Sequence, residues 1–368
     1  MAVEYFVRFL EETWELWAAL SLPVGTFLAG WRAGWWRTVK QLEGSPTETK
    51  RRLLSAEQKL IAIQKASVSE VMAWDKPRPH DAPLSTMGNG ISKPVIMVAN
   101  LKGGVGKTTI SANVAAMIDR RFGQRVLAID LDYQGSMTAM MMLAAEHSLP
   151  ADDRNRVSYF LEGGHTSRGL RHLPIPLSPK LQRTKIVSAY HPLANLENRL
   201  LFSWLTGSEN SDVRYHLASA LRMMAEADLF DVCIIDAPPR MTTGFINAFC
   251  AATHILVPTI LDSLSSEATV YFVEQSESLR QQVNPNLKMI GILPNFTRSN
   301  TGLTSDEESQ VNYISNSIQP LIVGLGKSWL NVLCQGGRKF RSLQVRDLCI
   351  WMATRLKERF GTLLVLNC

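Results

Sequence analysis

A glycine-rich stretch of the chain has the residue types that bind phosphate. Residues 100–109 read Asn-Leu-Lys-Gly-Gly-Val-Gly-Lys-Thr-Thr, between a predicted strand and a helix that begins near Lys107. Glycines let the backbone wrap closely round an anion, and the N-terminal end of a helix adds positive potential. The Lys107 ammonium would reach the β- and γ-phosphates of a nucleotide, and the Thr108 hydroxyl would ligate Mg²⁺. We therefore predict a nucleotide site made by Gly103, Gly104, Val105, Gly106, Lys107, Thr108 and Thr109.

The stretch departs from the usual P-loop spacing, which has a glycine where Leu101 stands. An extra lysine, Lys102, precedes the glycines. The run KGGVGKTT resembles the deviant Walker A motif of the ParA/MinD family of ATPases. In that family the corresponding lysine reaches across a dimer interface to the nucleotide of the other subunit. The resemblance implies that Lys102 acts in trans on the phosphates, with a purpose comparable to that of an arginine finger.

Three aspartates follow in the order that the same family shows. Residues 127–136 resemble its D-x-D-x-Q-G switch segment, and residues 231–239 resemble its Walker B strand. By this resemblance Asp130 supports the Mg²⁺ region, and Asp132 orients or activates the attacking water. Asp236 would hold Mg²⁺ through water. The resemblance thus assigns Lys102, Lys107 and Asp132 to catalysis, and Thr108, Asp130 and Asp236 to the metal.

Two weaker similarities extend the match to the family. Residues 185–193, followed by Glu197, resemble the strand and loop before its dimer-contacting helix. Residues 291–298 resemble the strand and loop that contact the adenine base, so Asn295 and Phe296 are the candidate base-binding residues. The resemblance implies ATP and Mg²⁺ as cofactors, a homodimer that forms on ATP binding, and slow hydrolysis that needs a protein activator.

Short apolar runs separated by helical stretches predict the elements that position these residues. The runs are four to six residues long, as strands buried on both faces of a parallel sheet require. The lengths between them leave room for crossover helices. We therefore predict an α/β domain with a doubly wound, mainly parallel sheet and an α-helical N-terminal extension. The predicted strands are Val95–Ala99, Val126–Ile129, Val232–Ile235, Ile255–Val257 and Met289–Leu293.

The composition of the 368 residues excludes a mainly disordered chain, because 46% are hydrophobic and 20% are charged. The five cysteines are scattered without a CxxC pair, which argues against a zinc site or a disulfide framework and favours a reducing compartment. The net charge of +6 permits a nucleic-acid or an anionic lipid partner.

The first 46 residues form a tryptophan-rich hydrophobic segment. Residues 16–31 carry no charge, with acidic residues before them and basic residues after them. The run is short for a bilayer core of about 30 Å, although tryptophans at both of its ends resemble the aromatic belts of membrane segments. Two interpretations stay open: membrane association through residues 5–36, as a spanning or a re-entrant segment, or a helix packed on the protein's own surface or on a partner. A cytoplasmic protein associated with the inner face of the cell membrane follows from the first.

The rest of the chain divides at a run of prolines and glycines. Residues 47–74 have apolar side chains at helical spacing and predict an amphipathic helix. Residues 75–94 contain the prolines and glycines and predict a linker. Residues 95–368 would then form the ATPase domain with a basic C-terminal helical region.

The C-terminal region from Lys327 onwards is strongly basic, with eight basic residues against two acidic ones. The densest part is the run at 338–341, and the region extends to Arg359. Non-specific DNA binding through phosphate contacts is one interpretation, and a solvated helix face is the other.

Three functions compete for this pattern of motifs. The first is an ATP-dependent dimerisation switch that hydrolyses ATP to ADP and phosphate, of the ParA/MinD partition or positioning type. The second is a membrane-linked tyrosine kinase of the polysaccharide-export type, although Tyr313 is the last tyrosine and such kinases end in a tyrosine cluster. The third is a nucleotide-sensing scaffold or effector with little hydrolysis.

Overall fold

The computed structural model describes residues 51, 54–61, 74, 91, 93–148, 156–207, 211–297 and 303–323. The chain divides into two compact units, Met1–Val68 and Ser69–Cys368. In the first unit residues 54–61 are helical, within the predicted amphipathic helix. Residues 5–36 and the basic region after Lys327 lie outside the described residues. Within the described part of the chain, no helix is both long and apolar enough to cross a membrane.

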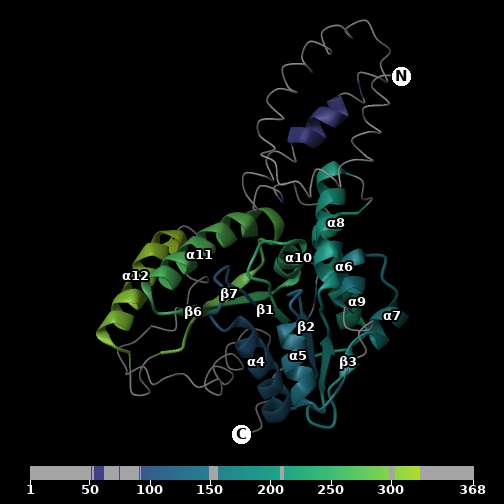
Figure 1. Cartoon of the computed structure of the whole chain (residues 1–368), viewed down its shortest axis with the longest axis horizontal. Helices are drawn as coiled ribbons and strands as arrows, with labels where there is room; N and C mark the ends of the chain where they lie inside the picture. The colour runs from purple at the N-terminus through teal and green to yellow at the C-terminus, as the bar shows by residue number, and fades with distance from the viewer. Residues whose placement is uncertain are drawn as a thin grey trace, which may run out of the picture. The chain divides into compact units, whose positions relative to one another are not determined.

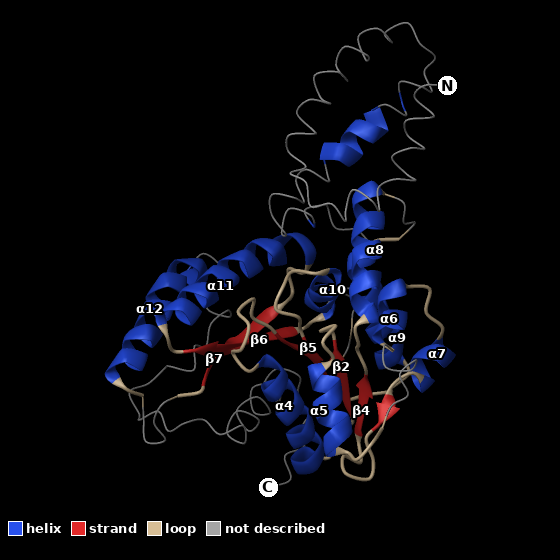
Figure 2. Cartoon of the chain, in the orientation of Figure 1, coloured by secondary structure: helices blue, strands red, loops and turns tan. Residues whose placement is uncertain are grey.

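The second unit is built on a 7-stranded sheet with the strand order β3-β4-β2-β5-β1-β6-β7. Every pairing is parallel except that of β3 with β4 at one edge. The sheet confirms the predicted α/β class, and all five predicted strands are present (Figure 1 and Figure 2). The strands are β1 (Val95–Val98), β2 (Val126–Asp130), β3 (Ile175–Pro176), β4 (Thr184–Val187), β5 (Val232–Asp236), β6 (His254–Ile260) and β7 (Lys288–Asn295).

Helices lie on both sides of this sheet, with α4 and α5 on one side and α10 and α11 on the other (Figure 2). This arrangement explains why all the residues of β1, β2 and β5 are buried. The helices are α4 (Lys107–Phe122), α5 (Ser136–Ala144), α6 (Val157–Glu162), α7 (Ser167–His172), α8 (Pro192–Thr206), α9 (His216–Glu226), α10 (Thr243–Ala251), α11 (Ser263–Val283) and α12 (Ser305–Val323), with a 3₁₀ turn η3 (Val213–Tyr215) before α9.

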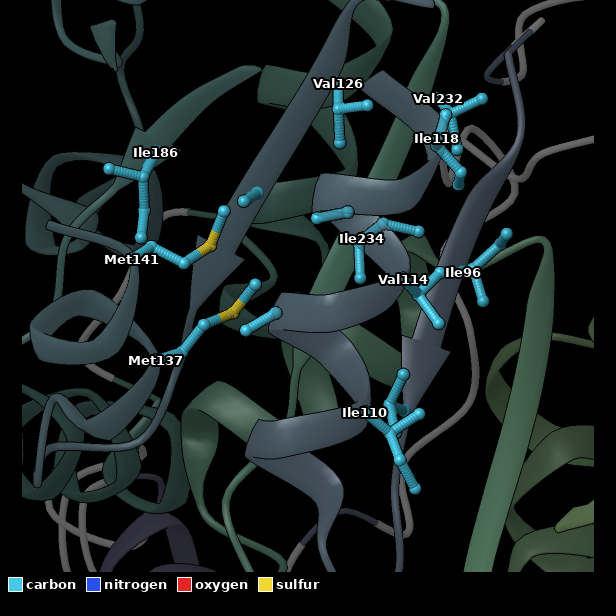
Figure 3. Packing of buried hydrophobic residues seen from close by; sticks show 14 of the residues in the cluster. Ile96, Ile110, Val114, Ile118, Val126, Met137, Met141, Ile186, Val232 and Ile234 are labelled. Carbon is cyan, nitrogen blue, oxygen red and sulfur yellow. The ribbon is translucent and has the colours of Figure 1, made fainter. Parts of the chain in front are cut away.

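The packing of α4 on the sheet fixes the helix that follows the glycine-rich loop (Figure 3). Ile110, Val114 and Ile118 recur every four residues along α4, so they share one face of the helix. That face meets alternate residues of the strands, such as Ile96 of β1 and Ile234 of β5. Burying each such side chain contributes about 1.5–3 kcal/mol to stability. The N-terminus of α4 is therefore held firmly at the end of β1.

The parallel strands end at a common edge of the sheet, and the predicted site residues lie along this edge. Asp130 at the end of β2 pairs in register with Asp236 at the end of β5. Val98 at the end of β1 pairs with Asp236 from the other side. The glycine-rich loop, the switch segment and the Walker B strand thus meet at the carboxyl ends of three adjacent strands. Ligands of open α/β sheets bind at this edge.

Candidate nucleotide-binding site

The glycine-rich loop has the backbone conformation that a phosphate cradle requires. Gly104 and Gly106 have φ angles of 77° and 89°, in the left-handed region that favours glycine. Gly106 is the N-cap residue of α4 and offers no side-chain hydrogen bond to the first turn. The N–H groups at the start of a helix have no partner within the helix. The loop can therefore direct these donors towards an anion.

Lys107 is turned inwards, towards its own loop. Its side chain is buried, and its Nζ donates a 2.9 Å hydrogen bond to the backbone carbonyl oxygen of Lys102. Burial lowers the pKa of the Lys107 ammonium, while the nearby carboxylates of Asp236 and Asp132 act to raise that pKa. The lysine thus lies between the loop and two of the predicted acidic residues.

Lys102 is held through its backbone. Its N–H donates a 3.0 Å hydrogen bond to Oδ1 of Asn100, and Asn100 is itself fully buried. The side chain of Lys102 is half-buried. Its charge contributes to the lowered pKa of Asp262, after the main cause, which is a hydrogen bond from the Ser265 backbone. The Lys102 charge therefore lies near the loop between β6 and α11.

The structure brings Thr108 and Asp236 together at the end of β5. A hydrogen bond from the Thr108 hydroxyl lowers the pKa of Asp236, and so does one from Ser111, whose Oγ lies 3.0 Å from the Asp236 Oδ1. Burial is nevertheless the largest effect and raises the pKa of Asp236. A hydroxyl and a carboxylate side by side are the oxygen ligands that suit Mg²⁺.

Asp130 accepts hydrogen bonds from the residues that follow it in the chain. It is fully buried, and its Oδ1 accepts a 3.1 Å hydrogen bond from the Asp132 backbone. Its Oδ2 accepts two bonds of 2.8 Å from the backbone N–H and the hydroxyl of Thr138 in α5. Burial, followed by the charge of Asp236, raises the pKa of Asp130. Both oxygens of Asp130 thus hold the segment that carries Asp132.

Asp132 lies at the turn of this segment. It is half-buried, and its Oδ1 accepts a 3.0 Å hydrogen bond from the Gln134 backbone. Its charge acts on the pKa values of Lys107, Asp236 and Glu197. The structure therefore places Asp132 close to Lys107 and Asp236.

Glu197 belongs to the site region, although the sequence only placed it after a loop. It lies on α8 and is 5% exposed. Its Oε1 accepts hydrogen bonds from the Thr242 hydroxyl and, at 2.7 Å, from the Gly244 backbone. Burial is the main cause that raises the pKa of Glu197, and the charge of Asp132 raises it further. The signal in the sequence is a single acidic residue in the mainly apolar run of α8.

Asn295 and Phe296 lie against the glycine-rich loop. The Asn295 Nδ2 donates a 3.0 Å hydrogen bond to the carbonyl oxygen of Val105. A Cβ atom on Gly106 would stand 2.1 Å from that Nδ2 and 3.5 Å from the Phe296 ring. Phe296 has a φ angle of 54° and is 63% exposed. The end of β7 therefore closes over the start of α4, with the Phe296 ring available to a ligand.

The described residues contain no group of three His, Cys, Asp or Glu side chains that could hold a metal by themselves. Mg²⁺ in nucleotide sites takes one or two protein oxygens and completes its shell with phosphate oxygens and water. Thr108 and Asp236 supply such oxygens beside the loop. The residues present thus fit Mg²⁺ bound together with a nucleotide.

The chain matches a known family over more than half of its length. The sequence model described as "AAA domain" covers residues 93–289. The chromosome-partitioning ATPase Soj of Thermus thermophilus is 30% identical over 222 residues, which are 59% of this chain and 74% of that protein. The chromosome partitioning protein ParA of Myxococcus xanthus is 29% identical over 231 residues, which are 62% of this chain and 74% of that protein.

Solved structures share the fold. Cobyrinic acid a,c-diamide synthase from Mycobacterium smegmatis, solved with bound ADP and magnesium, has a TM-score of 0.55 and 26% identity. The match covers 74% of this chain and 98% of that one. A variant of McdA from Cyanothece, solved as its ATP complex, has a TM-score of 0.51 at 19% identity, covering 62% of this chain and 81% of that one. With the glycine-rich loop and the three aspartates in family order, these similarities show that the chain belongs to the ParA/MinD family of P-loop ATPases.

Proposed function

We propose that the chain is an ATP-dependent dimerisation switch of the partition or positioning type, which hydrolyses ATP to ADP and phosphate. The observation that carries the proposal is the cluster of Lys107, Thr108, Asp132 and Asp236 at the ends of adjacent parallel strands. One cation, one hydroxyl and two carboxylates beside a glycine loop are the groups that phosphoryl transfer to water needs.

The proposed cofactors are ATP and Mg²⁺. The N–H groups of the glycine loop and of the first turn of α4 would bind the phosphates. Mg²⁺, when bound, would neutralise charge on the β- and γ-phosphates, held by Thr108 and through water by Asp236. The Phe296 ring, exposed beside the loop, offers a stacking surface for the adenine base. Asn295, whose amide donates a hydrogen bond to the Val105 carbonyl oxygen, would hold the neighbouring Phe296 beside the loop.

The proposed chemistry is attack of a water oxygen on the γ-phosphorus, with breakage of its bond to the bridging oxygen of ADP. Asp132 would orient the water and accept its proton, and Lys107 would stabilise the charge that develops on the phosphate oxygens. Asp130 would keep the Asp132 backbone in place and so support the Mg²⁺ region. Lys107 must exchange the Lys102 carbonyl for phosphate oxygens when ATP binds.

Lys102 would contribute from the second subunit of an ATP-bound homodimer. Lys102 is a half-buried residue, and its charge acts on Asp262 in the isolated chain. A cation supplied in trans makes hydrolysis depend on assembly, in the same way as an arginine finger. This dependence is what a dimerisation switch requires, and a protein activator would set its rate.

Light scattering on the full-length protein tests the dimer. We expect a dimer with ATP and Mg²⁺ and a monomer with ADP or without nucleotide. The Asp132→Ala variant should hold the dimer longer, because ATP is consumed more slowly. A mass that is the same with and without ATP would contradict the dimerisation switch.

The platform of the switch, meaning the membrane or the DNA to which it would bind, is a separate proposal. Residues 5–36 would bind the inner face of the cell membrane, and the basic region after Lys327 would bind DNA without sequence preference. Co-sedimentation with anionic vesicles and retention on duplex DNA, each with and without ATP, distinguish the two. Binding to neither would remove both platforms and leave a protein partner as the anchor.

A further inference from the structure

Trp74 lies outside the sequence span that matches the family, yet it is buried in the ATPase unit. The matched span begins at residue 93, whereas the compact unit begins at Ser69. The Trp74 side chain is only 1% exposed. An indole is the largest apolar side chain, and burying one contributes strongly to docking. This tryptophan therefore fixes a point of the N-terminal part of the chain on the ATPase unit.

Three groups from different elements hold Trp74. Its ring stacks on the Trp204 ring of α8, with centroids 6.3 Å apart and an interplanar angle of 22°. Its indole N–H donates a 3.2 Å hydrogen bond to the carbonyl oxygen of Met241, just before α10. Its own carbonyl oxygen accepts a 3.1 Å hydrogen bond from Arg214 of η3. The ring, the indole N–H and the backbone carbonyl oxygen of Trp74 therefore each have a partner in the ATPase unit.

Arg214 makes this contact specific. The guanidinium is fully buried, lies 4.7 Å from the centroid of the Trp204 ring and pairs with Asp212 at 2.7 Å. A buried guanidinium is costly unless its donors are satisfied. Trp74 supplies one acceptor for it, on its backbone. Removal of the Trp74 segment would thus expose a buried cation as well as an apolar surface.

The docking site continues into the nucleotide site through two adjacent residues. Met241 accepts the indole hydrogen bond, and the next residue, Thr242, donates its hydroxyl to Glu197. Glu197 also accepts a 2.7 Å hydrogen bond from the Gly244 backbone N–H, and a Cβ atom on Gly244 would stand 3.5 Å from the carbonyl oxygen of Leu131, the residue before Asp132. Glu197 and Trp204 stand seven residues apart on α8, so they share one face of that helix. On this face of α8, Glu197 therefore contacts the residues at the start of α10, and Trp204 contacts Trp74.

We propose that Trp204, Arg214 and Met241 form an intramolecular docking site for Trp74, and that this site transmits the docking of Trp74 to Asp132. The docking of Trp74 would then control hydrolysis through the turn Met241–Gly244. The docking itself stands on the contacts described above. The effect on hydrolysis rests on the proposed function.

Hydrogen exchange and ATP turnover of the full-length protein test the two parts separately. Trp74→Ala removes the ring, and Trp74→Phe keeps a ring but removes the indole donor. We expect about tenfold faster exchange in residues 241–251 for Trp74→Ala and a smaller increase for Trp74→Phe. Turnover should fall about fivefold in Trp74→Ala. Tyr271→Ala truncates an aromatic side chain that is 57% exposed on α11 and should change neither quantity.

Each outcome decides one part of the proposal. Unchanged exchange in residues 241–251 of Trp74→Ala would overturn the docking site. Faster exchange with wild-type turnover would overturn the transmission to Asp132. Exchange that rises equally in α11 would indicate general unfolding of Trp74→Ala. The exchange of residues 241–251 in Trp74→Phe then decides whether the docking site exists. Absence of any hydrolysis by the wild type would contradict the proposed function, while the exchange data would still decide the docking.

Discussion

The Lys107 ammonium donates a 2.9 Å hydrogen bond to the backbone carbonyl oxygen of Lys102, so the two lysines of the glycine-rich loop are joined. The bond orders the loop between them and keeps a buried cation satisfied. In the mechanism that we propose, phosphate oxygens replace that carbonyl when ATP binds. Nucleotide binding would therefore be coupled to the conformation of Lys102, the residue that we propose to act in trans.

Lys107→Ala should weaken binding of ATP with Mg²⁺ by at least about tenfold, because a charge-assisted contact to phosphate is lost. Titration calorimetry measures the affinity. Lys185→Ala is the matched control, since Lys185 is an exposed lysine of β4 away from the loop. Equal losses in both variants would show that the effect is one of general charge rather than of the loop.

Gly106→Ala should abolish nucleotide binding and lower stability. The added Cβ would stand 2.1 Å from the Asn295 Nδ2 at a φ angle of 89°. Gly123→Ala is the matched control, because Gly123 has a φ of 61° and no atom within 4 Å of its Cβ position. It should lose about 1 kcal/mol of stability through backbone strain alone. Thermal unfolding compares the two, and Asn295→Ala should partly rescue Gly106→Ala only if the clash is real.

Thr138→Val should lower the free energy of unfolding by about 2 kcal/mol, since it removes a hydroxyl that bonds the buried Asp130 carboxylate. The same hydroxyl accepts a 3.1 Å hydrogen bond from the Ala189 backbone. Urea unfolding measures the change. Ser136→Ala, an exposed position at the start of α5, should be neutral. A neutral Thr138→Val would mean that the Asp130 bonds contribute little to the switch segment.

Glu197→Gln should become more stable relative to the wild type as the pH rises from about 4.5, the ordinary pKa of a glutamate side chain. Burial raises the pKa of Glu197, so the folded protein binds its proton more tightly than the unfolded chain does. The stability that this group contributes is present below its ordinary pKa and is lost as the pH rises through the raised value. Glutamine keeps an acceptor oxygen for Gly244 and has no charge to bury.

Urea unfolding of both proteins at several pH values between 4 and 8 measures this difference. The comparison cancels the buried Asp130 and Asp236, which both proteins share. A stability difference that stays constant over this range would contradict the assignment of a raised pKa to Glu197.

The sequence predicted the parallel strands and the position of the glycine-rich loop between a strand and a helix because both depend on local patterns. Buried strands are continuous apolar runs, and a phosphate loop needs glycines, a lysine and a threonine at fixed spacing. Gly106 illustrates this dependence, since its left-handed backbone admits few other residues. The carboxyl ends of parallel strands then bring Asp130 and Asp236 together without further information, and Asp132 follows Asp130 by two residues.

The remaining features depend on contacts between distant segments, which leave no pattern in the sequence. The sequence indicates no more than loop and helix surface for residues 151–182, because α6 and α7 have only six residues each and β3 has two. Glu197 meets Gly244 across 47 residues, and Trp74 meets Met241 across 167. Trp74 reads in the sequence as the end of an amphipathic helix, and only the fold places it against Trp204.

Phosphate release from ATP tests the central claim most directly. The full-length wild type, Lys102→Ala and Lys107→Ala are compared with anionic vesicles, with duplex DNA and with neither. We predict that the wild type exceeds Lys107→Ala by at least about tenfold in at least one of the three conditions. Lys102→Ala should lose turnover while it still binds ATP. Wild-type release equal to that of Lys107→Ala in all three conditions would contradict the account of this chain as an ATP hydrolase.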